Sequence, residues 1–479
     1  MSRLPASFLL VAALAAGGCA VNPATGSNQL MLVSEAREIQ MGQQYDSQVV
    51  ATIGLYPDAV WQRYLQQLGA RLAATSERPN LPWTFRVLND PAVNAFALPG
   101  GFVYVTRGIL PYLNSEAQLA SVVGHEIGHV TARHTAAEMS KQQLFGLGLA
   151  VGSLASADVA KYAATASQAL GILFLKFSRD DESQADQLGL RYLARANYDP
   201  REMPAVFVML DRTGDGAGRL PEWLATHPTP AHRLEAIDRH IAALPQNFAG
   251  TVVSRDAYEQ RLSGVIFGVN PREGYFSGAR FLHPELRFQL AFPAGWTTNN
   301  AAQAVIAVSP EQDAAIELSQ AAEASADAAA RAFWSQSGLT TGGSVRVSIG
   351  GLPAVQGSFA AASEGGTLRG AVVFVEYLGA VYRIVAYAPE ARWSAYRAAA
   401  EGTLQSFRRL TDPAALNVQP LHVAIVTLTR PTTIAQLARE RSSPVAAERL
   451  AVINQVELQT TFASGRLVKW VVGVAPPVP

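Results

Sequence analysis

The chain has 479 residues, of which 49% are hydrophobic and 16% charged, and its 38 Lys and Arg residues are balanced by 38 Asp and Glu. A chain of this length and hydrophobic content is expected to form several domains with sizeable cores. The zero net charge argues against nucleic acid or an anionic membrane surface as the principal partner.

The N-terminal segment has the pattern of a secretory signal. A basic residue precedes an uncharged apolar run from Phe8 to Gly18, which is too short to span a bilayer as a stable helix. Small residues precede Cys19, the one cysteine of the chain, and this arrangement resembles a bacterial lipoprotein cleavage site, where the cysteine becomes the lipidated first residue. The alternative is cleavage at a neighbouring small residue, which leaves a secreted protein without lipid. We expect a signal peptide over residues 1–19 and a linker over 20–33. In such lipoproteins an aspartate directly after the cysteine commonly marks retention in the inner membrane, so Ala20 at this position favours the outer membrane.

Two helices and a β-hairpin are predicted next. Helical periodicity extends over Ser34–Val50 and Asp58–Leu72, and alternation over Trp83–Leu88 predicts a strand. A Pro-Gly-Gly turn then separates two strand-prone arms between Asn94 and Val105, which predicts a hairpin. An exposed edge strand can pair with an extended peptide by β-augmentation, and the alternative is a hairpin without a ligand. The first residues of the hairpin are therefore candidate substrate-binding positions: Asn94, Ala95 and Phe96.

The following predicted helix contains the pattern H-E-x-x-H. Ser115 and Gln118 form a capping-box pattern at its start, and an apolar stripe continues at helical spacing. At about 3.6 residues per turn, His125 and His129 lie on one face, where two imidazoles can bind one Zn²⁺. Glu126 points about a quarter-turn away and can reach a metal-bound water without being a ligand. The alternative is a pair of core histidines that are held by hydrogen bonds.

Two apolar runs, Leu144–Ala155 and Ala169–Leu175, follow this helix. Each run is short for a membrane span, and the charged residues Asp158 and Lys161 lie between them. We therefore expect a pair of soluble helices in this part of the chain. The alternative is a partial insertion into a membrane.

A catalytic zinc needs three protein ligands and one open position, so the two histidines require a third residue. His134 lies nine residues after His125, about 180° around the same helix, and it faces away unless the helix ends first. Glu182 and Asp186 stand at i and i+4 on a later predicted helix. One of them can bind the metal while the other holds a ligand imidazole in its tautomer, and the alternative is a solvated acidic helix face.

Motifs in a fixed order carry a family resemblance: H-E-x-x-H-x-x-x-R-H at His125 to His134, Glu182-x-x-x-Asp186, His227-Pro228, and Arg233 six residues after that histidine. This set resembles the HtpX/BepA-like zinc metalloendopeptidases of the CAAX prenyl protease type. The resemblance extends from about Ser34 to Leu244 and implies a mainly helical zincin-type peptidase domain with a small β-sheet, which we place at residues 34–265. It also implies that Glu182 is the third zinc ligand, that Asp186 supports a ligand, and that His227 lies near the metal.

The predicted chemistry is peptide-bond hydrolysis with one Zn²⁺ per chain, bound by His125, His129 and Glu182. Zinc lowers the pKa of its water, and Glu126 takes the proton as the water attacks the carbonyl and then passes it to the leaving amine. For the developing oxyanion, His227 is the first candidate donor and Arg233 the second. Two alternatives remain for His227: it occupies the open zinc position and keeps the enzyme latent, or it is an ordinary loop histidine.

The predicted fold class is multidomain α+β. After the peptidase domain, short strand patterns and two helical stretches predict an α+β sandwich-like domain over 270–410, which resembles the PsbP type and serves as a binding surface or a passive spacer. Residues 415–479 resemble a small LysM-like βααβ module. Pro431-Thr432-Thr433 stands where such modules carry Gly-Asp-Thr, so the sequence does not predict glycan binding with this motif.

These patterns together predict a zinc-dependent endopeptidase of the bacterial cell envelope, periplasmic and anchored to the outer membrane by a lipid on Cys19. The family resemblance implies protein substrates, namely misfolded or stalled envelope proteins. The rival hypothesis is an envelope scaffold or chaperone that binds peptidoglycan or an assembly machinery, with proteolysis secondary.

Overall fold

The computed structural model describes residues 19–149, 177–213, 223, 227, 232–245, 247–363 and 366–474. The predicted signal peptide up to Gly18 and the second apolar run lie outside the described residues. Within these ranges, no helix combines the length and the apolar composition that a bilayer crossing requires.

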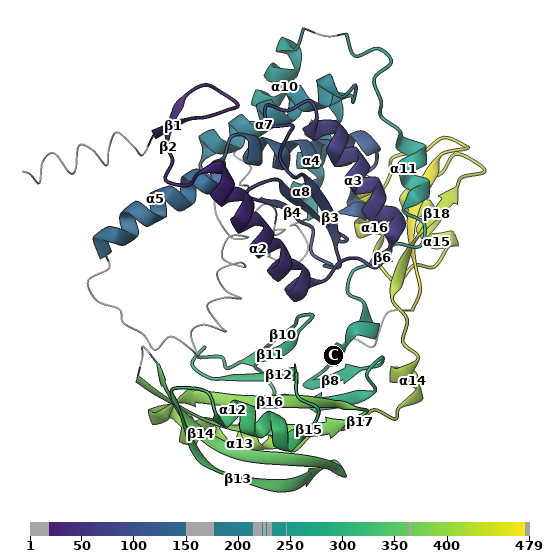
Figure 1. Cartoon of the computed structure of the whole chain (residues 1–479). Helices are drawn as coiled ribbons and strands as arrows, with labels where there is room; N and C mark the ends of the chain where they lie inside the picture. Colours follow the sequence, from purple (N-terminus) through teal and green to yellow (C-terminus); the bar gives the residue numbers. More distant parts are fainter. Residues whose placement is uncertain are drawn as a thin grey trace, which may run out of the picture.

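The peptidase region consists of a small sheet surrounded by helices (Figure 1). In the sheet, β3 (Thr84–Leu88) runs parallel to β5 (Phe102–Thr106), and β4 (Ala95–Leu98) pairs antiparallel with β5 and forms the edge. The predicted hairpin is therefore present, and both glycines of its turn have a positive φ, 80° at Gly100 and 102° at Gly101. The helices are α2 (Glu35–Ile53), α3 (Ala59–Ala73), α4 (Glu116–Thr131), α5 (His134–Leu149), α7 (Arg179–Arg195), α8 (Met203–Thr213), α10 (Arg233–Ala243) and α11 (Arg255–Arg261).

The first two helices begin where the sequence predicts. The polar residue at the start of each predicted stretch is its N-cap. Ser34 accepts a hydrogen bond from the backbone N–H of Arg37, and Asp58 accepts from the N–H groups of Val60 and Trp61.

Residues 275–409 form an antiparallel unit with its own core, which we call the middle domain (Figure 1). Its main sheet has the strand order β10 (Thr297–Asn300), β11 (Ala304–Val308), β12 (Ala315–Ala321), β16 (Ala380–Pro389), β15 (Gly366–Tyr377), β14 (Leu352–Ser363) and β13 (Leu339–Ile349). A smaller sheet has the order β17 (Arg408–Arg409), β9 (Phe288–Ala291), β8 (Arg280–His283) and β7 (Tyr275–Ser277). The predicted α+β character of this part of the chain is confirmed.

At the central strand β15, both faces of the main sheet are covered, and successive side chains point to opposite faces. On β15, Val372 and Phe374 pack in one cluster with residues of α12 (Ala326–Trp334). Val373 and Val375 pack in another cluster with residues of α13 (Glu390–Leu404) and of the smaller sheet. The middle domain therefore needs no apolar surface from the peptidase region.

The sequence patterns do not predict β14, although it pairs along its length with β13 and β15. The strand contains Pro353, Gly357 and a run of alanines, residues with a low preference for strands. Pro353 lies at the second position of the strand, where the loss of one backbone donor is tolerated. Pairing with two neighbours therefore decides the conformation here, against local preference.

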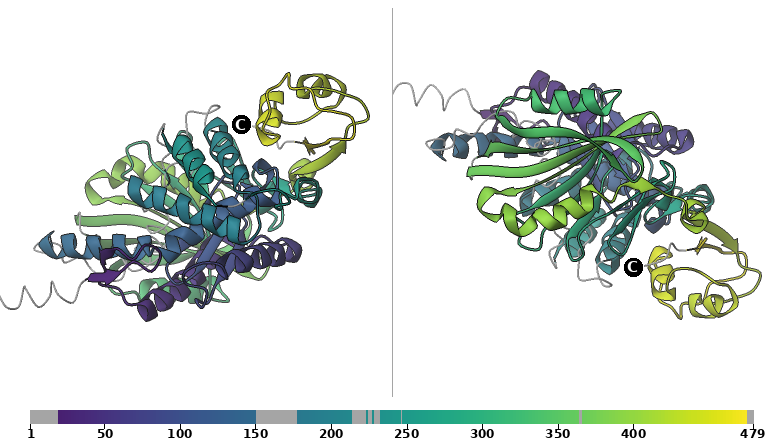
Figure 2. Two further views of the ribbon diagram at one scale, coloured as in Figure 1. Left: turned by 90° about the horizontal axis from the view of Figure 1, so that it is seen from above. Right: turned by 90° about the horizontal axis from the view of Figure 1, so that it is seen from below.

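The chain end has the strand–helix–helix–strand order that the sequence predicts, and we call residues 421–472 the C-terminal module. β18 (Leu421–Thr427) pairs antiparallel with β19 (Leu467–Val472) and also with β6 (Ile266–Phe267) of the peptidase region, while α15 (Ile434–Glu440) and α16 (Ala447–Ile453) lie between the strands in sequence. In both views of Figure 2 the module lies at one end of the molecule, next to α11. Its buried Ile453 and Trp470 belong to the same hydrophobic core as Leu119 of α4.

A buried lysine joins the C-terminal module to the turn that precedes α4. Lys469 is fully buried, and its Nζ donates hydrogen bonds to the backbone oxygens of Pro111 at 2.7 Å and Leu113 at 2.8 Å. Burial holds the pKa of Lys469 well below its usual range, and a neutral amine has two N–H groups for these two acceptors. The side chain of Asn114 also donates to the backbone oxygen of Asn454 in the module at 3.0 Å. The module thus holds the start of the H-E-x-x-H helix.

Candidate metal centre

α4, which carries the H-E-x-x-H pattern, begins with a hydrogen-bonded cap. Ser115 Oγ accepts from the backbone N–H of Gln118 at 3.1 Å, as the capping pattern predicts. The side chain of Gln118, however, accepts from the N–H of Asn114 at 2.7 Å, so the return bond of the capping box goes to the preceding residue. Every residue from Ala117 to Thr131 is buried, which places both histidines inside the protein.

Small residues allow α7 to approach α4 closely. A Cβ at Gly128 would lie 2.9 Å from the backbone oxygen of Ala185, and one at Gly189 would lie 3.1 Å from the backbone nitrogen of His125. A glycine inside a helix costs about 1 kcal/mol relative to alanine, so these positions need a packing reason, and the helix crossing supplies it. The crossing places Glu182 opposite the two histidines.

Four side chains converge in the way that a metal ion requires. The Nε2 atoms of His125 and His129 lie 3.0 Å apart, and each lies 3.6 Å from an oxygen of Glu182. Together with His227, one ligand atom from each residue lies within 4.8 Å of the others. Ligand atoms about 2.0–2.2 Å from a tetrahedral zinc are roughly 3.3–3.6 Å from one another, so the three predicted ligands fit a zinc ion.

Glu182 is a buried carboxylate with an oxygen that has no hydrogen-bond donor in the described residues. It is 3% exposed, and its Oε1 accepts no hydrogen bond from the part of the chain that the structure describes. Its Oε2 lies 2.9 Å from Nη2 of Arg233, an ion pair. Burial raises the pKa of Glu182 well above its usual range, and the Arg233 charge opposes this effect. A buried carboxylate oxygen without a donor supports a metal ion as its partner.

Asp186 lies behind His125, as a residue that fixes a ligand tautomer should. Its Oδ1 is 2.9 Å from Nδ1 of His125, and its Oδ2 accepts a hydrogen bond from Nε of Arg233 at 2.7 Å. Burial raises the pKa of Asp186, but the Arg233 charge and the hydrogen bonds from His125 and Arg233 outweigh it, so the pKa lies below its usual value. The ionised carboxylate accepts from Nδ1–H of His125 and leaves Nε2 for a metal.

Glu126 lies beside the ligands without being one of them. Its Oε1 accepts a hydrogen bond from Nε1 of Trp223 at 3.3 Å and lies 3.8 Å from Nε2 of His227. Burial raises the pKa of Glu126 to about 8, while the hydrogen bond from Trp223 opposes this shift. The position matches the predicted role of a base next to the metal.

Trp223 is a site residue that the sequence analysis does not identify. Its ring stacks on His227 with the centroids 4.9 Å apart and an angle of 15° between the planes. Its backbone N–H donates to the oxygen of Val93, next to the edge strand β4, at 3.4 Å. The available signal was its position four residues before His227, one helical turn away.

His134 reaches the site because α4 ends early. Arg133 has a φ of 61°, which breaks the helix between α4 and α5 and turns His134 back toward His129. A left-handed conformation costs a residue with a side chain roughly 1–2 kcal/mol. Arg133 is held there by hydrogen bonds to Glu38 Oε1 at 2.8 Å and to the backbone oxygen of Val33 at 2.6 Å. His134 contacts one of the two predicted metal ligands, since its Nδ1 lies 3.0 Å from Nδ1 of His129.

The candidate substrate-binding residues lie on or next to the edge strand β4, and their side chains are buried. Asn94 is 8% exposed, Ala95 0% and Phe96 7%. The ring of Phe96 stacks on Tyr104, with the centroids 4.7 Å apart. A peptide at this edge would therefore have the backbone of β4 as its partner rather than these side chains.

Sequence comparison relates part of the chain to known proteins. Residues 60–241 match peptidase family M48. The chain is 34% identical over 220 residues to the beta-barrel assembly-enhancing protease of Escherichia coli K12, a match that covers 44% of this chain and 45% of that protein. It is 40% identical over 164 residues to the mitochondrial metalloendopeptidase OMA1 of Arabidopsis thaliana, which covers 34% of this chain and 32% of that protein. The chain thus spans less than half the length of these curated relatives.

Comparison with solved structures finds a likeness to the cyanobacterial PsbP protein of Synechocystis sp. PCC 6803. The two are 12% identical, with a TM-score of 0.24, over 28% of this chain and 95% of that protein. A TM-score this low carries no inference about the fold or function of the chain.

Proposed function

Residues 60–241 are a domain of peptidase family M48, and from this premise we propose that the chain is a zinc-dependent endopeptidase of the bacterial cell envelope. The observation that carries the proposal is the buried convergence of His125, His129 and Glu182, with Glu126 beside them. An arrangement of buried core histidines would not need a carboxylate opposite both Nε2 atoms. A solvated acidic face would not bury Glu182.

In this proposal His125, His129 and Glu182 hold the ion. Zinc, when bound there, acts as a Lewis acid for the substrate carbonyl and lowers the pKa of water. Glu126 takes a proton from the attacking water on its carboxylate and then donates it to the leaving amine. The high degree of burial excludes bulk water, so the charges of these groups act at short range in a low-dielectric site.

Arg233 and His227 have different roles in this scheme. The guanidinium of Arg233 is engaged by Asp186 and Glu182, which supports a role in holding these two carboxylates rather than in binding the oxyanion. His227 Nε2 lies 4.0 Å from Glu182 Oε1 and 3.8 Å from Glu126 Oε1, under the ring of Trp223. This position supports a closed, latent state in which His227 takes the fourth ligand place. When His227 leaves the fourth ligand place, the same imidazole is the candidate donor to the oxyanion.

The proposal also covers the substrates and the location of the enzyme. The name of the relative from Escherichia coli supports envelope proteins as substrates, and the lipoprotein-like segment supports a lipid on Cys19 and a periplasmic position at the outer membrane. We propose that the middle domain, which resembles the PsbP type in sequence pattern, provides a binding surface for a substrate or an assembly machinery. For the LysM-like module, the core that it shares with the peptidase region supports a structural role rather than peptidoglycan binding.

The test is the variant Glu126→Gln, with metal content and casein cleavage as the two measurements. The variant should retain one zinc per chain, while cleavage falls by about 10²- to 10⁴-fold, the usual contribution of a general base. Glu182→Ala should lose the zinc. Glu235→Gln, an exposed glutamate whose side chain is 68% accessible, is the matched control and should cleave normally. Cleavage at the parent rate by Glu126→Gln would exclude the mechanism.

The rival scaffold function makes a different prediction. If Glu126→Gln restored an envelope defect in cells that lack the protein, proteolysis would be secondary, and binding by the middle domain or the C-terminal module would carry the function. Failure of the variant to restore the defect, with normal protein level, supports the peptidase.

A further inference from the structure

The two metal-binding histidines are supported in different ways. His125 donates from Nδ1 to the carboxylate of Asp186, whereas Nδ1 of His129 lies 3.0 Å from Nδ1 of another histidine, His134. Two ring nitrogens at this distance form a hydrogen bond in which one donates and the other accepts. The direction of that bond decides which nitrogen of His129 is left for a metal. Contacts further from the metal determine the direction.

The direction is set first at the N-terminal hairpin, formed by β1 (Cys19–Val21), β2 (Asn28–Leu30) and the turn between them. Asn22 is 3% exposed, and its Oδ1 accepts from the backbone N–H of Ala24 at 2.9 Å. Its amide group Nδ2 therefore faces the other way, toward the backbone oxygen of Ala132 at 3.2 Å and toward Oε1 of Gln184 at 3.1 Å. Asn22 is a donor to both.

Gln184 on α7 connects Asn22 to His134 and fixes which nitrogen of His134 carries a hydrogen. The atom of Gln184 that faces the Asn22 amide must be its oxygen, and this same Oε1 lies 2.9 Å from Nε2 of His134. An amide oxygen accepts only, so Nε2 of His134 carries a hydrogen. Asp181 Oδ1, 3.5 Å from the same nitrogen, favours that hydrogen as well.

The last step is the histidine pair. His134 is 3% exposed, and such burial favours the neutral imidazole, which has an acceptor at Nδ1 when its hydrogen is on Nε2. His129 must then donate from its own Nδ1. Nε2 of His129 then keeps its lone pair, as does Nε2 of His125 at 3.0 Å. Two lone pairs at this distance are favourable only beside a shared cation, which is the place of the proposed metal ion.

We propose that the N-terminal hairpin, Gln184 and His134 form a hydrogen-bond relay that holds His129 in the Nδ1–H tautomer, so that its Nε2 is presented to the metal. His134 is a positioning residue in this relay, and it acts through His129. The inference rests on the proposed metal site. It links that site to the residues directly after Cys19, which the matched family region, residues 60–241, does not include.

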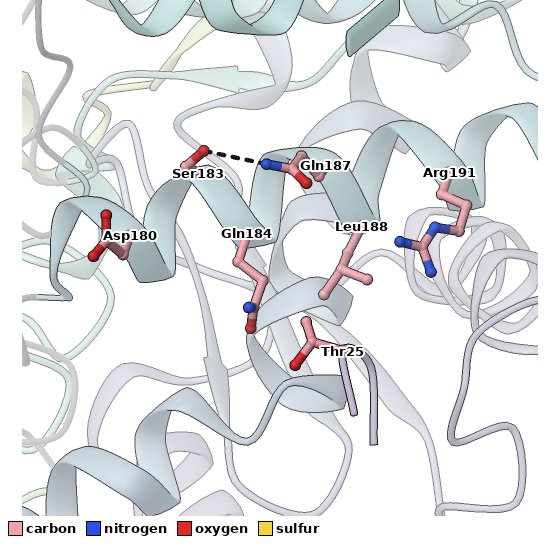
Figure 3. A pocket seen from close by; sticks show the side chains of 7 residues that line it. All are labelled: Thr25, Asp180, Ser183, Gln184, Gln187, Leu188 and Arg191. Carbon is pink, nitrogen blue, oxygen red and sulfur yellow. Dashed lines mark hydrogen bonds between the residues drawn. The ribbon is translucent and has the colours of Figure 1, made fainter. Parts of the chain in front are cut away.

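Figure 3 shows the place where the hairpin meets α7. A cavity of about 250 Å³ lies there, lined by Thr25, Asp180, Ser183, Gln184, Gln187, Leu188 and Arg191. Gln184 extends toward Thr25 of the hairpin turn, whereas Gln187 on the same helix donates to Ser183. Gln187 is thus a matched control for Gln184, because it has the same side chain on the same helix without a role in the relay.

The first experiment measures zinc affinity of the full-length protein by competition with a chelator. His134→Phe removes the acceptor for His129 and should weaken zinc binding by about 10- to 100-fold, the usual effect of losing the partner of a metal-binding histidine. Gln184→Leu removes the acceptor for the Nε2–H of His134 and should also weaken zinc binding. Gln187→Leu, the matched control on the same helix, should bind as the parent does. Zinc binding by His134→Phe at the parent affinity would overturn the relay.

The second experiment reads the tautomer directly, by ¹⁵N NMR of histidine-labelled protein without metal. His129 should carry its proton on Nδ1 in the parent and in Gln187→Leu, and Gln184→Leu should add a population protonated on Nε2. A proton on Nε2 of His129 in the parent would sink the inference. Gln184→Leu retains both histidines, so it decides the question even if His134→Phe does not fold. If the parent binds no zinc at all, the proposed function fails, and the tautomer measurement still tests the relay.

Discussion

The middle domain and the C-terminal module follow each other in the sequence but are built in opposite ways. Phe374 and Val373 of the middle domain are buried in clusters made of the domain's own residues. Trp470 and Ile453 of the C-terminal module are buried in the core of the peptidase region. The comparison teaches that the middle domain is an insertion into a single unit, which is completed only when the last strands return to β6.

The polar contacts of the two regions differ in the same sense. The segment that leads into the middle domain contacts the peptidase region through an exposed hydrogen bond between Asn89 and Glu273. The C-terminal module is joined by the buried amine of Lys469 and by a buried amide of Asn114. Exposed polar contacts contribute little to stability, whereas buried ones are costly to break.

The largest effect should come from two deletions, one that removes both regions and one that removes the middle domain alone. A chain that ends at Asn270 loses β18 and β19, exposes part of the peptidase core and should be insoluble or unable to retain zinc. A chain in which residues 270–418 are replaced by a short Gly/Ser linker should fold and cleave casein, because Phe267 and Leu421 are paired neighbours. Soluble yield, zinc content and casein cleavage are the measurements. An active protein ending at Asn270 would refute the shared core.

A large core substitution should separate the two regions next. Phe374→Ala removes a ring that packs against Phe333 and Trp334, and it should destabilise the middle domain by about 3–5 kcal/mol. Zinc content and casein cleavage at low temperature should be unchanged, because the core is separate. Calorimetry should show that only one of the thermal transitions moves. Loss of zinc in this variant would show that the two cores are coupled.

A smaller effect is expected from Lys469→Met, which keeps the length of the side chain and removes both hydrogen bonds. The backbone oxygens of Pro111 and Leu113 would lose their buried donor, which lowers the free energy of unfolding by roughly 1–3 kcal/mol in total. The loss is limited to this range because the variant no longer has a polar amine to bury. Denaturant unfolding of the peptidase region measures this change. Lys141→Met, at a lysine that is 46% exposed, is the control and should unfold as the parent does.

The smallest effect, counted per pH unit, is a dependence of stability on pH. The folded-state pKa of Lys469 is lowered by burial, so the unfolded state binds more protons between that pKa and the usual value of 10.5. The free energy of unfolding should therefore rise with pH in this window, by up to about 1.4 kcal/mol per unit. Lys469→Met should reduce the slope by that amount. Equal slopes in unfolding titrations of the two proteins between pH 7 and 9.5 would argue for a charged amine.

Most helices and strands near the site could be predicted from the sequence, because the signals that place them are local. Periodicity and capping residues place α2, α3 and α4 correctly, and the Pro-Gly-Gly turn places the hairpin before α4. Spacing on a helix also brings Glu182 and Asp186 to one face of α7, where the structure finds both beside His125. β14 is missed because its local composition disfavours a strand.

By itself, the sequence predicted the chemistry of the centre, because His125 and His129 lie one turn apart on a single helix and Glu126 directly follows the first of them. Tertiary structure alone decided what surrounds it. The helix stops at Arg133 because Glu38 and Val33 hold that residue, and only then does His134 reach His129. The bond from Lys469 to Pro111 joins residues 358 positions apart. Contacts at such separations depend on how the whole chain packs, and no local pattern of residues records them.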